Sequence, residues 1–536
     1  MLRNGGSPKR TEAKPIGEHI GKGKRNATLA SLAGTLRRRG ASESTILTAL
    51  LEENCQRCSP PLDEKEVAEI AKSVSRYEPD ESSTPSTGLK ETDFHRTDSG
   101  NAELFAALNR DLLRYDHRRK RWLLWGEHWW ISDPTEQIVQ LAKEAALTRQ
   151  RLSLEIGSQK DKESAMQWAF GNESKARIDN TIKLARSEPS LADKGTDWDL
   201  DPWLMGVGNG VVDLRTGDIR DGQPEERITL YTDTLFDSEA PCPRWLQFLD
   251  EIFGGDPDLI DFIHRAAGYS LTGDISEQCL FFCYGKGANG KSVFLKTLRH
   301  VLGPYAKDTA FTTFEMRNKS SIPNDLAALA GSRFVTSSET NEGTRLHEAR
   351  IKAMTGGDPV TARFLHNEYF TYFPTFKILL AVNHKPLVRD DSYGFWRRVR
   401  LIPFEQKFEG ESDDKRLDEK LLDEAPGILA WAVRGCLEWQ RRGLESPESV
   451  KSATEAYQAE SDPLADFLDE RCVLGPEYKA QASLLFSAYQ SWCDEYHLRD
   501  RDRLNHIAFG ERMTAKFFKK KDRGKWMYHG IGIAGE

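Results

Sequence analysis

Residues 285–292 read GKGANGKS, and they fit the pattern G-x4-G-K-[ST] at every position. The apolar stretch CLFFCY precedes them and the amphipathic stretch SVFLKTLRHVL follows, so we expect a strand before this loop and a helix after it. Glycines let successive backbone N–H groups point inward, and a helix N-terminus adds a partial positive charge. The spacing therefore predicts a phosphate-binding loop made of Gly285, Lys286, Gly287, Ala288, Asn289, Gly290, Lys291 and Ser292.

Two side chains of this loop carry the expected chemistry. Lys291 would bridge the β- and γ-phosphates of ATP, and Ser292 would ligate Mg²⁺. A chain of this length shows the pattern by chance roughly 2% of the time, and the strand and helix around the loop lower that figure further. ATP and Mg²⁺ are therefore the predicted cofactors.

Three further apolar stretches follow the loop, and polar residues lie at their ends. RFVTSSE ends at Glu339, whose carboxylate could polarise the water that attacks the γ-phosphate. TFKILLAVN ends at Asn383, whose amide could sense that phosphate or hold the same water. FWRRVRLIPF begins with Arg397 and Arg398, which suit an arginine finger reaching a nucleotide on a neighbouring subunit. Buried strands with polar ends and surface arginine pairs are common, so it is their order behind the loop that favours catalysis.

This order of motifs resembles that of superfamily 3 helicases of the phage/plasmid primase-helicase kind, a branch that includes poxvirus primase-helicases. GKGANGKS matches the Walker A motif of the family, VTSSE its Walker B strand, AVNHKP its sensor and FWRRVRLIPF its arginine-finger strand. KAMTGGD, with Lys352, Gly356, Gly357 and Asp358, matches the motif that separates this family from other P-loop classes. The resemblance implies an α/β fold with an AAA+-like P-loop ATPase core around a parallel sheet.

The resemblance extends over most of the chain. DPWLMGVGNGVVDLRTG resembles the domain before the motor, and FGERMTAKFFKKKDRGKWMYHGIGI resembles a winged helix. Helical periodicity over 26–77 resembles the small domain usually found C-terminal to a primase-polymerase domain. We therefore expect a flexible tail at 1–20, the small helical domain at 21–79, a linker at 80–100, an α/β pre-motor domain at 101–240, the ATPase domain at 241–448 and a winged-helix DNA-binding domain at 449–536.

Two features depart from the family pattern. The Walker B strand of the family often ends in two acids, whereas Ser338 precedes Glu339 here. Magnesium would then be held mainly by Ser292, the phosphates and water. The sequence also begins almost at the small helical domain, so we expect no primase-polymerase catalytic domain and carry over no priming activity.

The family works as a ring in which ATP binds between subunits, so the resemblance implies a homo-oligomer, most simply a hexamer. In the family, the segment after TGGD forms a hairpin that projects into the pore, which implies DNA contacts for Arg363 and His366. The basic C-terminal end would contact duplex phosphates. For both segments the alternative is that the charged side chains lie in solvent and contact no DNA. The predicted duplex-binding residues are Lys519, Lys520, Lys521, Arg523 and Lys525.

Bulk composition narrows the class of protein. The formal net charge is −8, yet residues 499–525 carry ten Lys or Arg against four acids, which suits a terminal module that touches nucleic acid. No apolar run is long enough to span a bilayer, and neither a signal peptide nor a disulfide framework is evident, so a cytoplasmic protein of a bacterial host cell with no membrane partner is expected. The spacing of Cys55 and Cys58 is typical of zinc ligands, but nothing completes a set of four.

These observations lead to one main hypothesis: an ATP-dependent superfamily 3 DNA helicase that replicates a phage, prophage or plasmid and acts on single-stranded and forked duplex DNA. Two alternatives stay open. The chain could be an initiator ATPase that binds and melts an origin, or the helicase subunit of a primase-helicase whose primase or polymerase lies on a separate chain.

Overall fold

The computed structural model describes most of the chain, which divides into two compact units, Met1–Asn109 with Gln137–Glu188 and Arg110–Glu136 with Pro189–Glu536. The pre-motor region expected at 101–240 is thus shared between the units, with its helices in the first and its strands in the second. The described residues are 20–21, 25–38, 43–75, 88–316, 324–338, 343–365, 368–409, 414–499 and 503–534.

Three short helices form the N-terminal part of the first unit. Apolar residues at three- and four-residue spacing place Leu29, Leu50 and Val67 in one core, where each is fully buried. The helical periodicity predicted over 26–77 is therefore confirmed for the described residues. The elements are β1 (Ile20–Gly21), α1 (Arg25–Arg38), α2 (Glu43–Arg57), β2 (Cys58–Ser59) and α3 (Glu64–Ser75).

A bundle of four further helices completes this unit. The guanidinium of Arg149, 1% exposed, donates hydrogen bonds of 2.9 Å to Asn101 Oδ1 and to the carbonyls of Phe94 and His95. Part of the expected linker is thereby packed into the bundle, whereas residues 80–87 lie outside the described part. The helices are α4 (Asp98–Asn109), α5 (Gln137–Leu154), α6 (Gln159–Gly171) and α7 (Lys175–Ala185).

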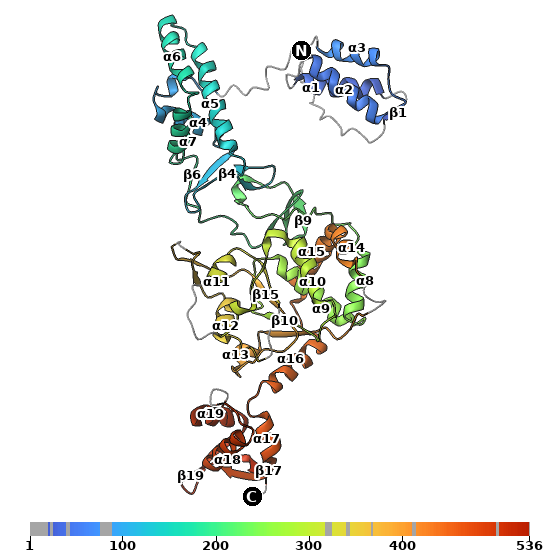
Figure 1. Ribbon diagram of the computed structural model, residues 1–536, viewed down its shortest axis with the longest axis vertical. Helices are drawn as coiled ribbons and strands as arrows, with labels where there is room; N and C mark the ends of the chain where they lie inside the picture. The colour runs from blue at the N-terminus through green and yellow to red at the C-terminus, as the bar shows by residue number, and fades with distance from the viewer. Residues whose placement is uncertain are drawn as a thin grey trace, which may run out of the picture. The chain divides into compact units, whose positions relative to one another are not determined.

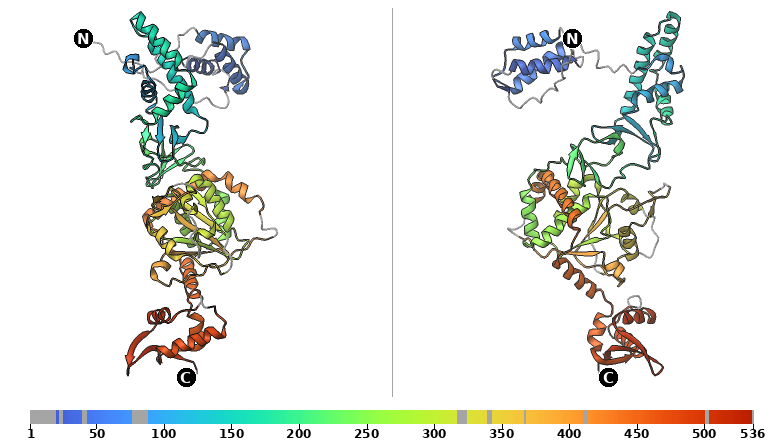
Figure 2. Two further views of the ribbon diagram at one scale, coloured as in Figure 1. Left: turned by 60° about the vertical axis from the view of Figure 1, so that its left-hand side comes forward. Right: turned by 180° about the vertical axis from the view of Figure 1, so that it is seen from behind.

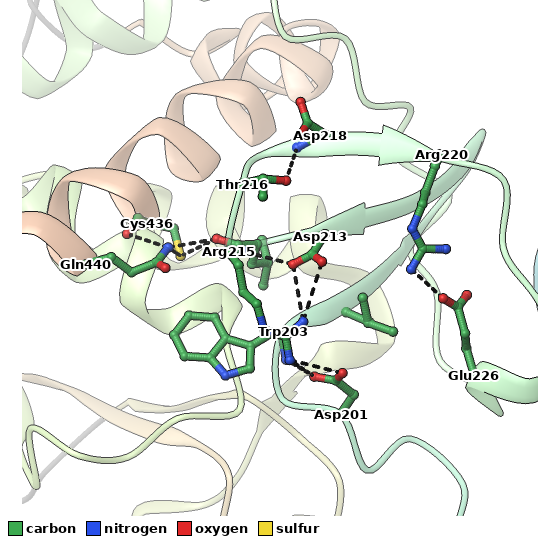
Figure 3. Close-up of polar contacts among 12 residues, drawn as sticks. Asp201, Trp203, Asp213, Arg215, Thr216, Asp218, Arg220, Glu226, Cys436 and Gln440 are labelled. Atoms are coloured by element: carbon green, nitrogen blue, oxygen red, sulfur yellow. Dashed lines mark hydrogen bonds and ion pairs between the residues drawn. The ribbon is translucent and has the colours of Figure 1, made fainter.

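The second unit begins with two small sheets. RWLLWGEHWW forms a hairpin in which Trp125 pairs with Trp130, and a two-residue turn of Gly208 and Asn209 joins two antiparallel strands of the other sheet. Figure 3 shows Gln440 of helix α15 (Ala425–Arg442) beside the second sheet, where its Nε2 donates to the Leu214 carbonyl at 2.8 Å. The strands are β3 (Leu113–Asp116), β4 (Arg121–Trp125), β5 (Trp130–Ser132), β6 (Ala192–Asp193), β7 (Leu204–Val207), β8 (Gly210–Asp213) and β9 (Asp218–Arg220).

A parallel five-stranded sheet forms the centre of the second unit, so the predicted α/β class with a parallel sheet is confirmed. Its strand order is β11-β12-β15-β10-β16, and every pairing is parallel. The apolar stretches CLFFCY, RFVTSSE, TFKILLAVN and FWRRVRLIPF all contribute strands, as predicted from their composition. The bounds are β10 (Leu280–Tyr284), β11 (Ala306–Asp308), β12 (Phe334–Ser338), β15 (Lys377–Val382) and β16 (Val399–Pro403).

Helices cover both faces of this sheet (Figure 1), because alternate strand residues are apolar on each side. On one face Phe281 and Cys283 pack with α8, α9, α10 and α15, and on the other Leu280 and Phe282 pack with α12, α13 and α16. The bounds are α8 (Pro243–Ile252), α9 (Pro257–Leu271), α10 (Lys291–Leu302), α11 (Asn324–Ala328), α12 (Glu348–Gly356), α13 (Tyr393–Trp396), α14 (Leu417–Asp423), α15 (Ala425–Arg442) and α16 (Glu448–Glu460).

Two cations are buried at the amino ends of β12 and β15. Arg333 donates to the carbonyls of Leu271 and Leu204 at 2.8 and 2.7 Å. Lys377 donates to the Thr272 and Asp274 carbonyls, and burial lowers its pKa to about 7. These bonds hold the C-terminus of α9 against the sheet, so the two residues stabilise the fold.

Strands β13 (Val360–Ala362) and β14 (Phe370–Tyr372) form a short hairpin. The described residues of 461–534, here called the C-terminal body, pack around a separate hydrophobic core. Figure 2 draws this body in red, with a long antiparallel hairpin, here called the C-terminal hairpin, made by β18 and β19. No helix among the described residues is long and apolar enough to cross a membrane. The elements of the body are α17 (Ala465–Arg471), β17 (Cys472–Gln481), α18 (Ala482–Glu495), α19 (His506–Lys516), β18 (Phe518–Asp522) and β19 (Lys525–Ile533).

Candidate functional site

The glycine-rich loop, residues 285–292, follows strand β10 and runs into the first turn of α10, as the sequence predicts. Two of its glycines are required by space. A Cβ on Gly285 would lie 2.1 Å from Asn289 Nδ2, and one on Gly290, whose φ is +81°, would lie 2.5 Å from a methyl group of Ile252. The glycines thus let the loop close tightly on itself and direct the start of α10 toward its centre.

Lys291 turns inward and joins the loop to a distant strand. Its Nζ donates to the Gly285 carbonyl at 2.6 Å, to Asn289 Oδ1 at 2.9 Å and to Asn383 Oδ1 at 3.1 Å. The residue is 5% exposed, and burial lowers its pKa. Lys291 and Asn383, 92 positions apart in the chain, are therefore brought together as a site would require.

The surroundings of Lys291 suit an anion. Ser292 is exposed on the first turn of α10, so its hydroxyl is accessible to a ligand. β12 lies beside β15, with Ser338 in register with Ala381, two residues before Asn383. Glu339 follows Ser338 directly but lies outside the described residues, so its predicted role stays a prediction. A cation, a helix N-terminus and an exposed hydroxyl together fit the phosphates and metal ion predicted from the sequence.

The arginine pair divides into one exposed and one buried residue. Arg397 is exposed, and its guanidinium donates to Gln278 Oε1. Arg398 is buried: its Nε donates to Thr355 Oγ1 at 3.2 Å and another nitrogen to the Gly394 carbonyl, while burial lowers its pKa. The guanidinium of Arg398 thus makes hydrogen bonds within its own chain, whereas Arg397 lies at the surface.

The pair also lies far from the glycine-rich loop of the same chain. β16 is parallel to β10, so Val399 pairs with Leu280 at one end and Pro403 with Tyr284 at the other. Arg397 precedes β16, whereas the loop follows β10. One strand of five residues, about 17 Å at 3.3 Å per residue, therefore separates them, which is more than the length of an arginine side chain.

An ion pair that the sequence did not predict joins helix α12, which runs into the TGGD motif, to the segment between Asn383 and Arg397. Lys352 Nζ lies 2.6 Å from Asp390 Oδ2. Burial would raise the pKa of Asp390, but the hydrogen bonds from Lys352 and Ser392 together lower it. The only signal in the sequence was the acidic pair that follows Arg389.

The predicted DNA contacts that the structure describes lie on or beside two hairpins. Arg363, at the end of β13, stacks over the ring of Tyr369 at 4.6 Å, whereas His366 lies outside the described residues. On the C-terminal hairpin Lys519 is half-buried, 5.1 Å from the centre of the Tyr528 ring. The remaining predicted cations of this hairpin are exposed: Lys520, Lys521, Arg523 and Lys525.

Four protein-family models match the chain. The model described as Primase C terminal 1 matches residues 16–80, D5 N terminal like matches 102–254, and Poxvirus D5 protein-like matches 459–529. A family of unknown function matches 283–398. These matches make the chain similar to D5-like primase-helicases over residues 16–80, 102–254 and 459–529, with a primase C-terminal-like domain in the N-terminal part, which agrees with the resemblance stated from the motifs.

Relatives of this D5-like protein carry corresponding names. "Putative helicase L207/L206" of Acanthamoeba polyphaga mimivirus is 29% identical over 317 residues, which is 55% of this chain and 33% of that protein. "Putative primase C962R" of African swine fever virus (isolate Tick/Malawi/Lil 20-1/1983) is 24% identical over 322 residues, again 55% of this chain and 33% of that protein. The chain thus spans about a third of the length of these relatives. Both come from viruses of eukaryotes, so a phage or plasmid setting and a bacterial host remain predictions.

A solved structure described as the apo form of the NrS-1 C terminal region aligns with 81% of this chain and 99% of its own. The sequences are 10% identical and the TM-score is 0.45, a likeness too distant to carry a conclusion about function.

Proposed function

We propose that this D5-like protein is an ATP-dependent DNA helicase of superfamily 3 whose ATP sites lie between identical subunits. The observation that carries the proposal is the placement of Lys291 and Arg397 at opposite ends of the β10–β16 pair. Arg397 is exposed and cannot reach the loop of its own chain, so it would act on the nucleotide of a neighbour. Such a head-to-tail contact generates a ring when the rotation closes, and six subunits are our expectation.

In this proposal the glycine-rich loop is a P-loop of an AAA+-like core. Lys291 would leave its three oxygen partners and bind the β- and γ-phosphates, which frees the Asn383 amide to orient the attacking water. Glu339 would accept the proton of that water. Mg²⁺ held by Ser292 would neutralise charge on the phosphates.

The energy of hydrolysis would move DNA through the ring. The β13–β14 hairpin would present Arg363 and His366 to the backbone of a single strand, and contacts to phosphate would make that binding independent of sequence. The C-terminal body would act as a winged helix, with the cations of its hairpin on duplex phosphates. This division suits a protein that engages forked DNA.

Turnover and strand displacement test this function together. We expect the purified chain to hydrolyse ATP, to do so faster with single-stranded DNA, and to displace a strand from a long forked duplex in an ATP-dependent reaction. Lys291→Ala is the matched control and should abolish both activities while the far-ultraviolet circular dichroism stays unchanged. ATP-independent melting confined to short duplexes would instead favour the origin-melting initiator.

A second candidate function is that of the helicase subunit of a primase-helicase. Two observations favour it: the match of residues 16–80 to a primase C-terminal model, and relatives named as primases. Primer synthesis measured with the chain alone and with a separately supplied primase-polymerase distinguishes the two. Stimulation of priming by this chain would support the second candidate.

A further inference from the structure

The strand that begins beside Arg397 ends beside the glycine-rich loop. Beyond Pro403, the last residue of β16, the Phe404 N–H donates to the Tyr284 carbonyl at 2.8 Å, and the Phe408 N–H donates to the Ala288 carbonyl at 2.7 Å. Residues 404–408 therefore run along the loop as a continuation of β16. Phe404 is 2% exposed and packs against the rings of Phe253 and Phe294, so this end of the strand is buried beside the loop.

Asn289 connects this segment to Lys291. Its Nδ2 donates to the Phe404 carbonyl at 3.1 Å, and its Oδ1 accepts from Lys291 Nζ at 2.9 Å. The residue is 4% exposed, and both ends of its amide have a partner. The amide orientation is fixed by chemistry, since a flip would place Nδ2 against an ammonium group and Oδ1 against a carbonyl.

A nucleotide in the loop would change the contacts of Asn289. The ammonium of Lys291 is shared among three oxygen atoms, of which Asn289 supplies one. A phosphate that took Lys291 would remove the charged donor from Oδ1 and leave the Nδ2 bond to Phe404 as a constraint on the amide. A change in the loop would thereby be passed to the carboxyl end of β16.

We propose that Asn289 is a positioning residue that couples the nucleotide state of the glycine-rich loop to Arg397 at the opposite end of β16. A strand paired along its length to β10 moves as a unit, so a shift at Phe404 reaches the arginine that serves the neighbouring subunit. Each subunit would thus report its own nucleotide to the next site in the ring. The inference rests on the proposed function and extends it to communication between sites.

Hydrogen exchange followed by mass spectrometry tests the coupling in the full-length protein. A non-hydrolysable ATP analogue should slow exchange in peptides from 285–292 and change it in peptides from 397–404. In Asn289→Ala the first effect should persist and the second disappear. Asn289→Asp keeps an oxygen for Lys291 and loses the donor to Phe404, so it should also lose the second effect. Asn209→Ala is the matched control, because Asn209 Nδ2 makes a similar 3.0 Å bond to the Phe236 carbonyl.

Steady-state kinetics give an independent readout. In Asn289→Ala the KM for ATP should not rise, because one competitor for Lys291 is gone, whereas kcat should fall and the Hill coefficient should decrease to about 1, the value for uncoupled sites. Exchange changes in 397–404 that survive both variants would overturn the proposal, as would wild-type turnover without cooperativity. A wild-type chain whose loop shows no response to the analogue would instead refute the proposed nucleotide site.

Discussion

Separate substitution of the two neighbouring arginines should give opposite phenotypes. Arg398→Ala removes a buried guanidinium that donates to Thr355 Oγ1 and to the Gly394 carbonyl. Hydrogen bonds from charged groups contribute about 1.5–3 kcal/mol each, and relief of the cost of burying the charge offsets part of the loss. We therefore expect the free energy of unfolding to fall by about 2–4 kcal/mol.

Arg397→Ala should have little effect on stability and a large effect on turnover. Its guanidinium is exposed and donates to the Gln278 side chain, so the free energy of unfolding should change by less than about 1 kcal/mol. An arginine finger contributes about 10³–10⁵ in kcat, so ATP turnover should fall by at least about a thousandfold. Arg416→Ala, which removes a surface arginine paired with Glu419, is the control for both measurements.

The assays are thermal unfolding followed by differential scanning fluorimetry and ATP turnover with saturating single-stranded DNA. Arg398→Ala should lower the unfolding midpoint by roughly 4–12 °C, whereas Arg397→Ala should leave it near the wild-type value. If Arg397→Ala keeps full turnover while Arg398→Ala loses it at an unchanged midpoint, the assignment of roles is reversed and the reasoning from burial fails.

The remaining predictions concern the loop, a buried lysine and the C-terminal hairpin. Lys291→Ala should abolish ATP binding measured by calorimetry without loss of fold, and measurable turnover would refute the loop assignment. Burial lowers the pKa of Lys377 to about 7, so between pH 7 and about 10 the unfolded chain binds a proton there that the folded chain has released. Over this range the free energy of unfolding of the wild type should rise with pH, relative to Lys377→Met, by at most about 1.4 kcal/mol per pH unit. Identical slopes of the two proteins in chemical denaturation would contradict this. Neutralising the five cations of the hairpin should flatten the dependence of log K for duplex binding on log salt by up to about 4.5, since each phosphate contact contributes about 0.9, and an unchanged slope would remove the hairpin from the DNA site. The changes are Lys519→Gln, Lys520→Gln, Lys521→Gln, Arg523→Gln and Lys525→Gln.

Local patterns were sufficient to predict the elements that carry the site. Runs such as CLFFCY and KILLAV are apolar on both faces, which is typical of strands buried in a parallel sheet, and the order of polar residues at their ends gave Lys291 and Asn383. Glycine spacing predicted the loop because its backbone geometry depends on residues adjacent in sequence. Contacts of this kind are encoded within a few positions.

Contacts between distant segments could not be predicted in the same way. Arg397 and Arg398 are identical in type and adjacent in sequence, and contacts such as that of Arg398 with Thr355, 43 positions away, distinguish the buried one. The hydrogen bond from Asn289 to the Phe404 carbonyl joins residues 115 positions apart, so no local sequence pattern predicts it. In the sequence, Arg333 and Lys377 are charged residues at the starts of strands, and nothing nearby indicates that they are buried. In the fold, carbonyl groups at the end of α9 accept their hydrogen bonds.

Complementation between two inactive variants tests the shared ATP site most directly. Lys291→Ala subunits cannot bind ATP but keep Arg397, whereas Arg397→Ala subunits bind ATP but lack the finger. Neither should turn over ATP alone, and an equal mixture assembled with DNA should recover up to about a quarter of wild-type turnover, the fraction of interfaces that combine an intact loop with an intact arginine. Mixtures that stay inactive at every ratio despite forming mixed oligomers, or an Arg397→Ala chain that is fully active by itself, would contradict hydrolysis between subunits.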